Sequence, residues 1–202
     1  MACRLCGFCI LTQANPKTTQ RPRGLYGVVV VHYKEPMGLF DFFRKKENKF
    51  DLDKVLRMDD QTAVVIALDT RVNELSNYGE DLTNLTEPQK NLLFVENAER
   101  EINNGGFNQF YWNSSGDFAH ETHTALQTIG ANQMADIVTK ANSVWPDQTV
   151  PKDRTRRQEI QEEIEAQANL TWDECDQEFY KYPDDIAGLL VKYVKKHRTE
   201  FE

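Results

Sequence analysis

The sequence predicts an all-α protein, with a single compact domain of about seven helices that follows an irregular N-terminal leader. Apolar residues recur at three- and four-residue steps along most of the chain after residue 59, which is the period of an amphipathic helix. Residues that favour helix starts, and glycines that favour helix ends, flank these segments. Only residues 28–31 resemble a strand. At 202 residues, 40% of them hydrophobic, the chain is long enough for one buried core and too short for two large domains.

The first part of the chain differs in composition from the rest. Residues 1–36 hold five bases, one acid and turn-rich stretches such as Asn15-Pro16, with no sustained helical or strand period. We hypothesise that translation starts at Met37, because the apolar residues and bases that follow it are typical of the start of a bacterial protein. Residues 1–36 are then a leader outside the native protein, residues 37–58 an N-terminal hook and linker, and residues 59–202 an acidic helical domain.

The first two helices of this domain have clear signals at both ends. A helix opened by Asp59-Asp60 should end near Asn77-Tyr78-Gly79, and its apolar face is formed by Val64, Val65, Leu68, Val72 and Leu75. The next helix should start with Thr86 as N-cap and Pro88 in its first turn. It should end at Gly105-Gly106, after an inner face of Leu92, Val95, Ala98 and Ile102.

The middle of the domain is aromatic and then helical again. Residues 107–112 should form a turn or short helix, with Phe107, Phe110 and Trp112 packing inward. Asp117 should cap a helix that Gly130 terminates, and another helix should cover about residues 131–144.

Charged helices should complete the chain. Asp153 should begin a helix whose inner face is Ile160, Ile164 and Ala168, and Thr171-Trp172-Asp173-Glu174 should be a capping box that starts the next one. Asp184-Asp185 should cap the last helix, whose inner face is Ile186, Leu189, Leu190, Tyr193 and Val194.

Net charge favours a basic partner. The chain carries −8 and has a pI near 5.1, and without residues 1–36 the charge is −12. A surface that binds nucleic acid needs clustered Lys and Arg, so we expect a basic protein as the partner and no direct contact with nucleic acid. No stretch approaches the roughly 20 apolar residues of a membrane span. Four cysteines, three of them in the first nine residues, are not a disulfide framework, so we expect a cytoplasmic protein.

The sequence offers no convincing catalytic, cofactor or metal site. The run of Cys3, Cys6 and Cys9 is one ligand short of a closed tetrahedral site, and we assign it to the leader. His120 and His123 lie three residues apart, which is not the zinc-protease spacing, so we favour an ordinary polar helix face over a metal site. The acids around Cys175 should disfavour its thiolate and therefore a nucleophilic role. We predict a protein that is not an enzyme and needs no cofactor.

Acidic residues are concentrated near the C-terminus. Residues 158–180 contain eight acids and no base, and Asp184 and Asp185 follow. Such a run is either a solvated face that keeps the protein soluble or a row of carboxylates that imitates phosphates. Two basic patches, at residues 154–157 and 192–198, weaken a mimic of the whole surface and could complement helix C-termini or a second subunit. The ten acids that we predict to bind the partner are Glu159, Glu162, Glu163, Glu165, Asp173, Glu174, Asp176, Glu178, Asp184 and Asp185.

Two motifs carry a family resemblance. The segment from Glu101-Ile102-Asn103-Asn104-Gly105-Gly106-Phe107 to Trp112-Asn113-Ser114-Ser115-Gly116 is similar to the signature of the DNA-mimic protein family, a group of bacterial helical proteins. Phe179-Tyr180 and the segment after Asp184 also resemble that family, so the similarity covers about residues 85–202. It implies an all-α fold and a homodimer whose acidic surface occupies the DNA-binding site of a transcription factor. The Asn-Gly-Gly-Phe motif itself should build a helix junction.

We therefore expect an acidic protein-binding domain that occupies the DNA-binding surface of a transcription factor or another nucleic-acid-binding protein. An alternative is an immunity-type or structural interaction module that neutralises a basic protein by the same electrostatics. A third hypothesis is an enzyme with a site near His120 and His123. Sequence alone does not identify the partner.

Overall fold

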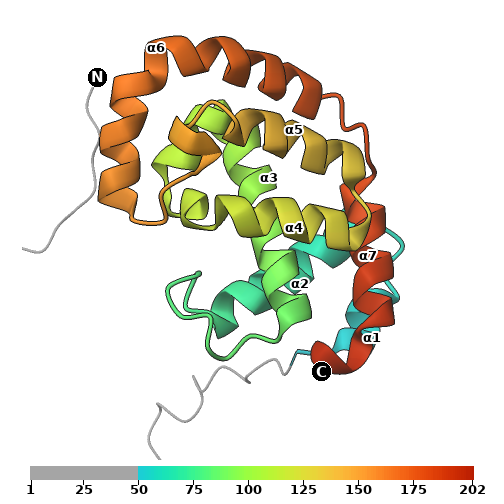
Figure 1. Ribbon diagram of the computed structural model, residues 1–202. Coiled ribbons are helices and arrows are strands. Elements are labelled where there is room, and N and C mark those ends of the chain that lie inside the picture. The colour runs from blue at the N-terminus through green and yellow to red at the C-terminus, as the bar shows by residue number, and fades with distance from the viewer. Residues whose placement is uncertain (1–49) are drawn as a thin grey trace, which may run out of the picture. The chain divides into compact units, whose positions relative to one another are not determined.

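The computed structural model describes residues 50–202, and this part of the chain is all-α, as predicted (Figure 1). Its seven α-helices are joined by loops, two of which contain a short 3-10 helix, and no strand occurs in residues 50–202. The expectations for the leader, for the strand at residues 28–31, for the cysteine run and for the hook fall on residues outside this range. The helices are α1 (Leu52–Leu56), α2 (Gln61–Leu75), α3 (Glu87–Trp112), α4 (Ala119–Ile129), α5 (Asn132–Asn142), α6 (Arg154–Phe179) and α7 (Ile186–Lys196).

Helix α3 lies at the centre of the fold. It packs against α2, α4 and α6, while α5 contacts both α4 and α6, and α7 packs on α2. Helix α6 curves around α3, α4 and α5, so one of its faces is buried along its length and the opposite face is convex (Figure 1). Large aromatic side chains fill the space between these helices, with ring centroids 5–6 Å apart. The fully buried ones are Phe107, Phe110, Tyr111, Trp145, Trp172 and Phe179.

Most of the predicted helix ends are confirmed. The Asp60 carboxylate accepts a hydrogen bond from the backbone N–H of Thr62 at the start of α2. Thr86 and Gln89 form a reciprocal capping box at the start of α3, and Asp185 caps α7. Gly130 ends α4 with a left-handed φ of 93°, a conformation that glycine adopts without steric cost. In addition, α1 places Leu52 and Val55 in the core.

The prediction of two helices over residues 153–180 is wrong, because α6 runs without a break through Thr171-Trp172-Asp173-Glu174. Its buried face includes the expected Ala168, and the expected Ile160 and Ile164 pack against the core, but other residues are buried more deeply. Arg157, Gln161, Ala168 and Trp172 are buried, whereas Ile160 and Ile164 are only half-buried. These four buried residues share one face of a continuous helix, so ending the helix before Trp172 would remove that aromatic ring from the core.

The segment after Ile102 also departs from expectation. Gly105 and Gly106 break the helical backbone as predicted, but the helix resumes at Phe107 without a loop, so α3 is one kinked helix. Trp112 was expected to pack inward and is 39% exposed, because it lies about 100° around the helix from the buried Tyr111. Asp117 does not cap α4, which has no side-chain cap, because its carboxylate pairs with arginines of α6.

Candidate protein-binding surface

The convex face of α6 carries a row of exposed carboxylates. We use the name acidic row for Glu159, Glu162, Glu163, Asp173 and Glu174, which are all exposed. They lie on the side of α6 away from Arg157 and Trp172, and the row spans about 22 Å of helix axis. Leu170 lies within the row and is 73% exposed. An exposed apolar side chain among carboxylates gives this face a point for hydrophobic contact as well as charge.

The density of charge along the row can be compared with that of DNA. Five carboxylates over roughly 22 Å give one charge about every 4–5 Å. Phosphates follow each other at about 3.4 Å of axis per strand, and a duplex carries one charge per about 1.7 Å. Averaged over its length, the acidic row approaches the charge density of one strand and remains well below that of a duplex, but its acids form two groups about 15 Å apart, at residues 159–163 and 173–174.

Several predicted acids have partners within the protein. Arg156 pairs with Glu159 at 3.1 Å, and Lys140 of α5 pairs with both Glu174 and Glu178 at 3.2 Å. The fold thus brings a base to a segment that has none in its own sequence. Asn108 donates a hydrogen bond to Glu165 at 3.1 Å. All of these pairs are partly exposed, and such pairs contribute at most about 1 kcal/mol each.

Three acids of the row have no partner within residues 50–202. Glu162, Glu163 and Asp173 make neither an ion pair nor a side-chain hydrogen bond in this part of the chain. Their carboxylates are solvated and ready to meet a positive charge without first losing a partner. This makes them the least compensated part of the acidic row.

Three other predicted acids hold the fold together. Asp176 accepts a hydrogen bond from the backbone N–H of Phe107 at 2.8 Å, and Asp184 accepts one from Met134 at 2.9 Å. Asp185 accepts one from Gly188 at 3.0 Å. Each of these carboxylates satisfies a backbone donor near a helix start, where the helix itself offers no acceptor. Their position is explained by local structure before any partner is considered.

The basic patch at the start of α6 is divided, with Arg157 internal and Arg154 and Arg156 exposed. Arg157 is fully buried, and its guanidinium donates to the carbonyl oxygens of Tyr111 at 2.6 Å and Asn113 at 2.9 Å and to Asp117 at 2.5 Å. Arg154 pairs with the same Asp117 at 3.2 Å. The carbonyls belong to the C-terminal end of α3, which agrees with the expectation that these bases complement helix C-termini.

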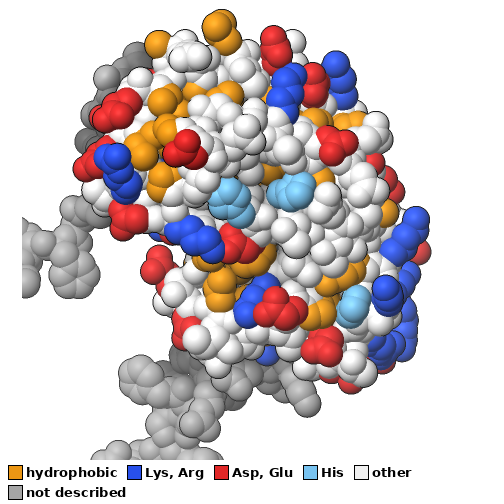
Figure 2. Space-filling view, in the orientation of Figure 1, with side chains coloured by type: hydrophobic (Ala, Val, Ile, Leu, Met, Phe, Trp, Pro, Cys, Tyr) orange, Lys and Arg blue, Asp and Glu red, His pale blue; other side chains and the backbone are white. Residues whose placement is uncertain are grey.

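The second basic patch remains on the surface. Lys192, Lys195 and Lys196 of α7 are exposed, and Figure 2 shows Lys and Arg side chains gathered over this helix. Lys195 and Lys196 lie in the last turn of α7, where a positive charge complements the helix dipole. Arg198 pairs with Asp53 and Glu202. The domain therefore presents acids on α6 and bases on α7.

The Gly-Gly kink of α3 depends on residues from the end of α6. Gly106 has φ 71° and ψ −172°, a conformation that only glycine adopts readily, and a Cβ there would collide with the Asp176 carboxylate. The kink exposes the N–H of Phe107 and the carbonyl of Ile102. Asp176 accepts from the first, and the Tyr180 hydroxyl donates to the second at 2.9 Å. These contacts satisfy the backbone groups that the bend leaves without helical partners.

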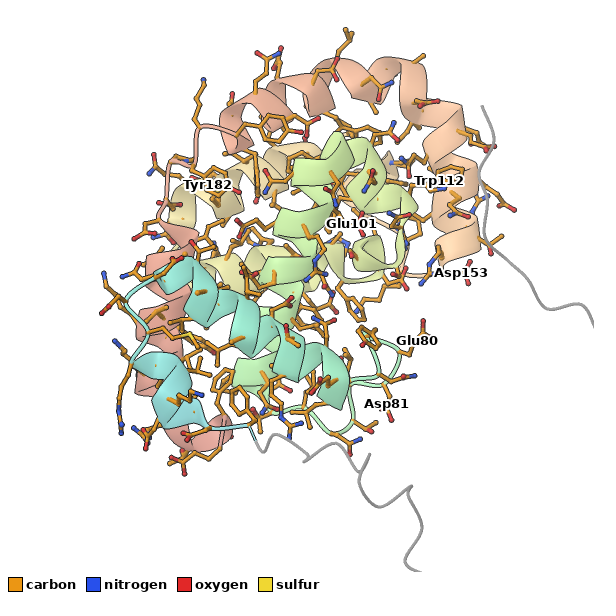
Figure 3. The ribbon with its side chains drawn as sticks, turned by 180° about the vertical axis from the view of Figure 1, so that it is seen from behind. Glu80, Asp81, Glu101, Trp112, Asp153 and Tyr182 are labelled. Atoms are coloured by element: carbon orange, nitrogen blue, oxygen red, sulfur yellow. The ribbon has the colours of Figure 1, made fainter. Side chains whose placement is uncertain are left out.

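A second clamp spans the kink within α3 itself. Glu101 precedes the glycines, and its Oε2 accepts hydrogen bonds from Gln109 at 2.8 Å and Asn113 at 2.7 Å, which follow them. Figure 3, which views the domain from behind, shows Glu101 on α3 and Trp112 nearer the start of α6. The conspicuous polar residues of this motif therefore bind one another, which agrees with the expectation that the motif builds a helix junction.

The chain from α3 to α7 matches a known protein family. The family model described as DMP19-like protein matches residues 83–197, more than half of the chain. The chain belongs to the DMP19-like family. The name stands for DNA mimic protein 19. The match contains the kinked α3 and the whole of α6, and so includes both the junction and the acidic row. Neither a curated protein nor a solved structure matches the chain.

In this DMP19-like protein, His120 and Cys175 lie in environments that explain them by local structure. His120 Nε2 accepts a hydrogen bond from the backbone N–H of Val150 at 3.2 Å. In residues 50–202, no group of three or more His, Cys, Asp or Glu residues is arranged to hold a metal ion. Burial raises the pKa of Cys175 to about 12, and the neighbouring acids add to this effect. The predicted suppression of the Cys175 thiolate is correct, but burial contributes more to the rise in its pKa than the neighbouring acids do.

Sequence reasoning missed a group of acids at the edge of the core. Glu96 and Glu99 of α3 line a pocket together with Tyr182, Asp184 and Asp185. Both glutamates directly follow inward-facing residues, Val95 and Ala98, and this repeated spacing was a signal that they flank the buried stripe.

Among residues 50–202, no helix is long and apolar enough to cross a membrane.

Proposed function

We propose that this DMP19-like protein binds a basic protein through the acidic row of α6 and thereby occupies the partner's DNA-binding surface. The observation that carries the proposal is the row itself: five exposed carboxylates on a convex helix, with no Lys or Arg in residues 158–180. The family name, DNA mimic protein 19, supports the same function. A transcription factor is the class of partner that we favour.

Electrostatic complementarity explains how such a row would select its partner. Arg and Lys side chains of a DNA-binding surface are arranged to meet closely spaced negative charges, and the two groups of carboxylates in the acidic row offer such charges. The unpaired Glu162, Glu163 and Asp173 offer charge without competition from the protein's own bases. Leu170 adds an apolar contact that DNA phosphates lack and gives the complex affinity that salt does not screen.

The lysines of α7 orient the complex. Lys192, Lys195 and Lys196 repel a basic partner, so a partner that approaches α7 is disfavoured while one that approaches α6 is attracted. Mimicry is therefore assigned to one face of the domain and not to its whole surface. No chemistry is required of the protein in this function, which consists of binding alone.

A pull-down with the full chain from its native lysate, at low and moderate salt, tests the proposal. The test variant neutralises the acidic row: Glu159→Gln, Glu162→Gln, Glu163→Gln, Asp173→Asn and Glu174→Gln. A charge-matched control neutralises five other exposed acids: Asp59→Asn, Glu80→Gln, Asp136→Asn, Asp147→Asn and Glu200→Gln. Bound proteins are identified by mass spectrometry.

We expect a nucleic-acid-binding protein that salt releases, that the control variant captures and that the acidic-row variant does not. Equal capture by both variants contradicts the assignment to α6. Capture of a toxin-like basic enzyme in place of a DNA-binding protein would replace mimicry with the immunity-type alternative.

A further inference from the structure

An acidic pocket of about 720 Å³ lies between α2, α3 and the start of α7. Its volume is within the range of sites that hold a small molecule or a side chain, roughly 300–1,000 Å³. Acids line it from two directions, with Glu96 and Glu99 on α3 and Asp184 and Asp185 before α7. No Lys or Arg belongs to its wall, which in the described residues also includes apolar side chains such as Ile66, 59% exposed at the rim.

Glu96 marks the deep part of the acidic pocket. Its Oε1 atom is buried and has no hydrogen-bond partner among residues 50–202. A buried acceptor without a partner is rare in folded proteins and costs about 1–3 kcal/mol. The neighbouring Glu99 is better satisfied, because the Tyr182 hydroxyl donates to it at 2.8 Å and in turn accepts from Asn103 at 2.6 Å. Figure 3 shows Tyr182 on the same side of the domain as Glu101.

The nearest base is already engaged. Arg100 pairs with Asp69 at 2.5 Å and donates to Asn97 at 2.8 Å. Burial, together with the negative charges of Glu99 and Asp69, raises the pKa of Glu96 to about 8, and the positive charge of Arg100 opposes this rise. Burial also raises the pKa of Glu99 and of Asp69. The fold thus holds several carboxylates together with too little positive charge to compensate them.

We propose that this pocket receives the guanidinium group of an arginine side chain that a protein partner presents. A guanidinium has five N–H donors in a fixed plane and can satisfy Glu96 together with Glu99, which a single point charge cannot do. The methylene stem of the arginine would lie against Ile66 at the rim. Charge complementarity favours a cationic occupant, because the acids that line the pocket would repel an anion.

The pocket is a second contact, separate from the acidic row. It rests on the proposed function only in the basic character of the partner, and its residues lie on α2, α3 and the segment 182–187. A variant of the acidic row should therefore still bind arginine in the pocket. A variant of the pocket should still show salt-dependent capture by α6, so the two proposals fail independently.

A titration of the full, isotopically labelled chain with Nα-acetyl-L-arginine N-methylamide, followed by backbone amide NMR, tests the site. We expect saturable shifts at Glu96, Glu99, Tyr182 and Ile66. The citrulline counterpart, which has the same shape without the charge, is the matched probe and should produce no saturable shift. Equal binding of both probes, or shifts confined to the acidic row, would overturn the proposal.

Proton linkage gives a second readout. A bound cation favours the ionised form of Glu96, so binding near pH 8 should release a proton and become up to roughly tenfold tighter between pH 7 and pH 9. Other titratable groups also face Glu96: Asp69 is paired, Asp184 and Asp185 bond backbone donors, and burial raises the pKa of Tyr182 to about 12. Burial raises the pKa of Glu99 too, so the Glu96→Gln variant is needed to assign the released proton to Glu96.

Calorimetry in two buffers of different ionisation enthalpy measures the released proton. Glu96→Gln should remove both the proton release and the pH dependence, whereas Glu163→Gln on α6 should leave them intact. The Gln variant should fold, because Glu96 is largely uncharged at neutral pH. Binding that is independent of pH in the native chain, or unchanged by Glu96→Gln, would contradict the assignment.

Discussion

Helices α3 and α6 are each 26 residues long and pack against each other, but different forces hold them in place. Helix α3 is stabilised mainly by apolar side chains, with Leu92, Val95, Ala98 and Ile102 buried along one stripe. The first half of α6 instead buries Arg157 and Gln161, and both bond to backbone carbonyls of α3. The contrast shows that hydrogen bonds position the first half of α6, whereas Trp172 and Phe179 anchor its second half in the core.

The largest effect should come from the buried arginine. Arg157→Met keeps much of the side-chain volume but leaves the carbonyls of Tyr111 and Asn113 without this donor, and the Asp117 carboxylate with only Arg154. Breaking a buried pair of this kind should lower the free energy of unfolding by about 3–5 kcal/mol. Urea denaturation followed by circular dichroism measures this change.

The matched control for Arg157 is its neighbour. Arg156 is exposed and pairs only with Glu159 on the surface, so Arg156→Met should cost less than about 1 kcal/mol. Equal effects of the two substitutions would show that hydrogen bonds to α3 do not position α6.

The junction between the two helices should respond next most strongly. Gly106→Ala places a Cβ against Asp176 and requires a backbone conformation that alanine avoids, so we expect a loss of about 3 kcal/mol in the free energy of unfolding. Gly79→Ala is the control, because Gly79 also has a positive φ of 86° but nothing within 4 Å of the added Cβ. A similar loss in both variants would mean that contact with α6 is unimportant at the kink.

The smallest effect separates structural acids from surface acids within α6. Asp176→Ala removes the acceptor of the Phe107 N–H and should cost about 1 kcal/mol, as the loss of a helix cap does. Asp173→Ala, one turn earlier and exposed, should be within about 0.5 kcal/mol of the native chain. Thermal denaturation of both variants distinguishes them, and the reverse order would contradict their assignment.

The same contrast explains which parts of the fold the sequence predicts. Helix α3 follows the 3.6-residue period, and its start at Thr86 and its break at Gly105-Gly106 were readable from local signals. The inner face of α6 was not, because the buried Arg157 bonds to groups forty or more residues away in sequence, at Tyr111, Asn113 and Asp117. Nothing near Arg157 indicates that these groups await a donor.

The candidate site shows the same limit. The exposed acids of α6 were evident from composition, but composition does not distinguish Asp173, which is solvated, from Asp176, which bonds Phe107. Lys140 comes from another helix to pair with Glu174 and Glu178. The capping pattern at Thr171 predicted a helix start that tertiary packing overrides, since Trp172 is buried in an uninterrupted α6. Long-range partners, and not local pattern, decide the role of each charge.

Competition with DNA tests the central claim most directly. Once the partner is captured, a duplex that contains its binding site is titrated into the complex, and bound DMP19-like protein is measured by fluorescence anisotropy. If the acidic row occupies the DNA-binding surface, the duplex displaces the protein, and the apparent Kd for the protein rises in proportion to free duplex concentration. A ternary complex, with DNA and protein bound together and the Kd unchanged, would contradict mimicry.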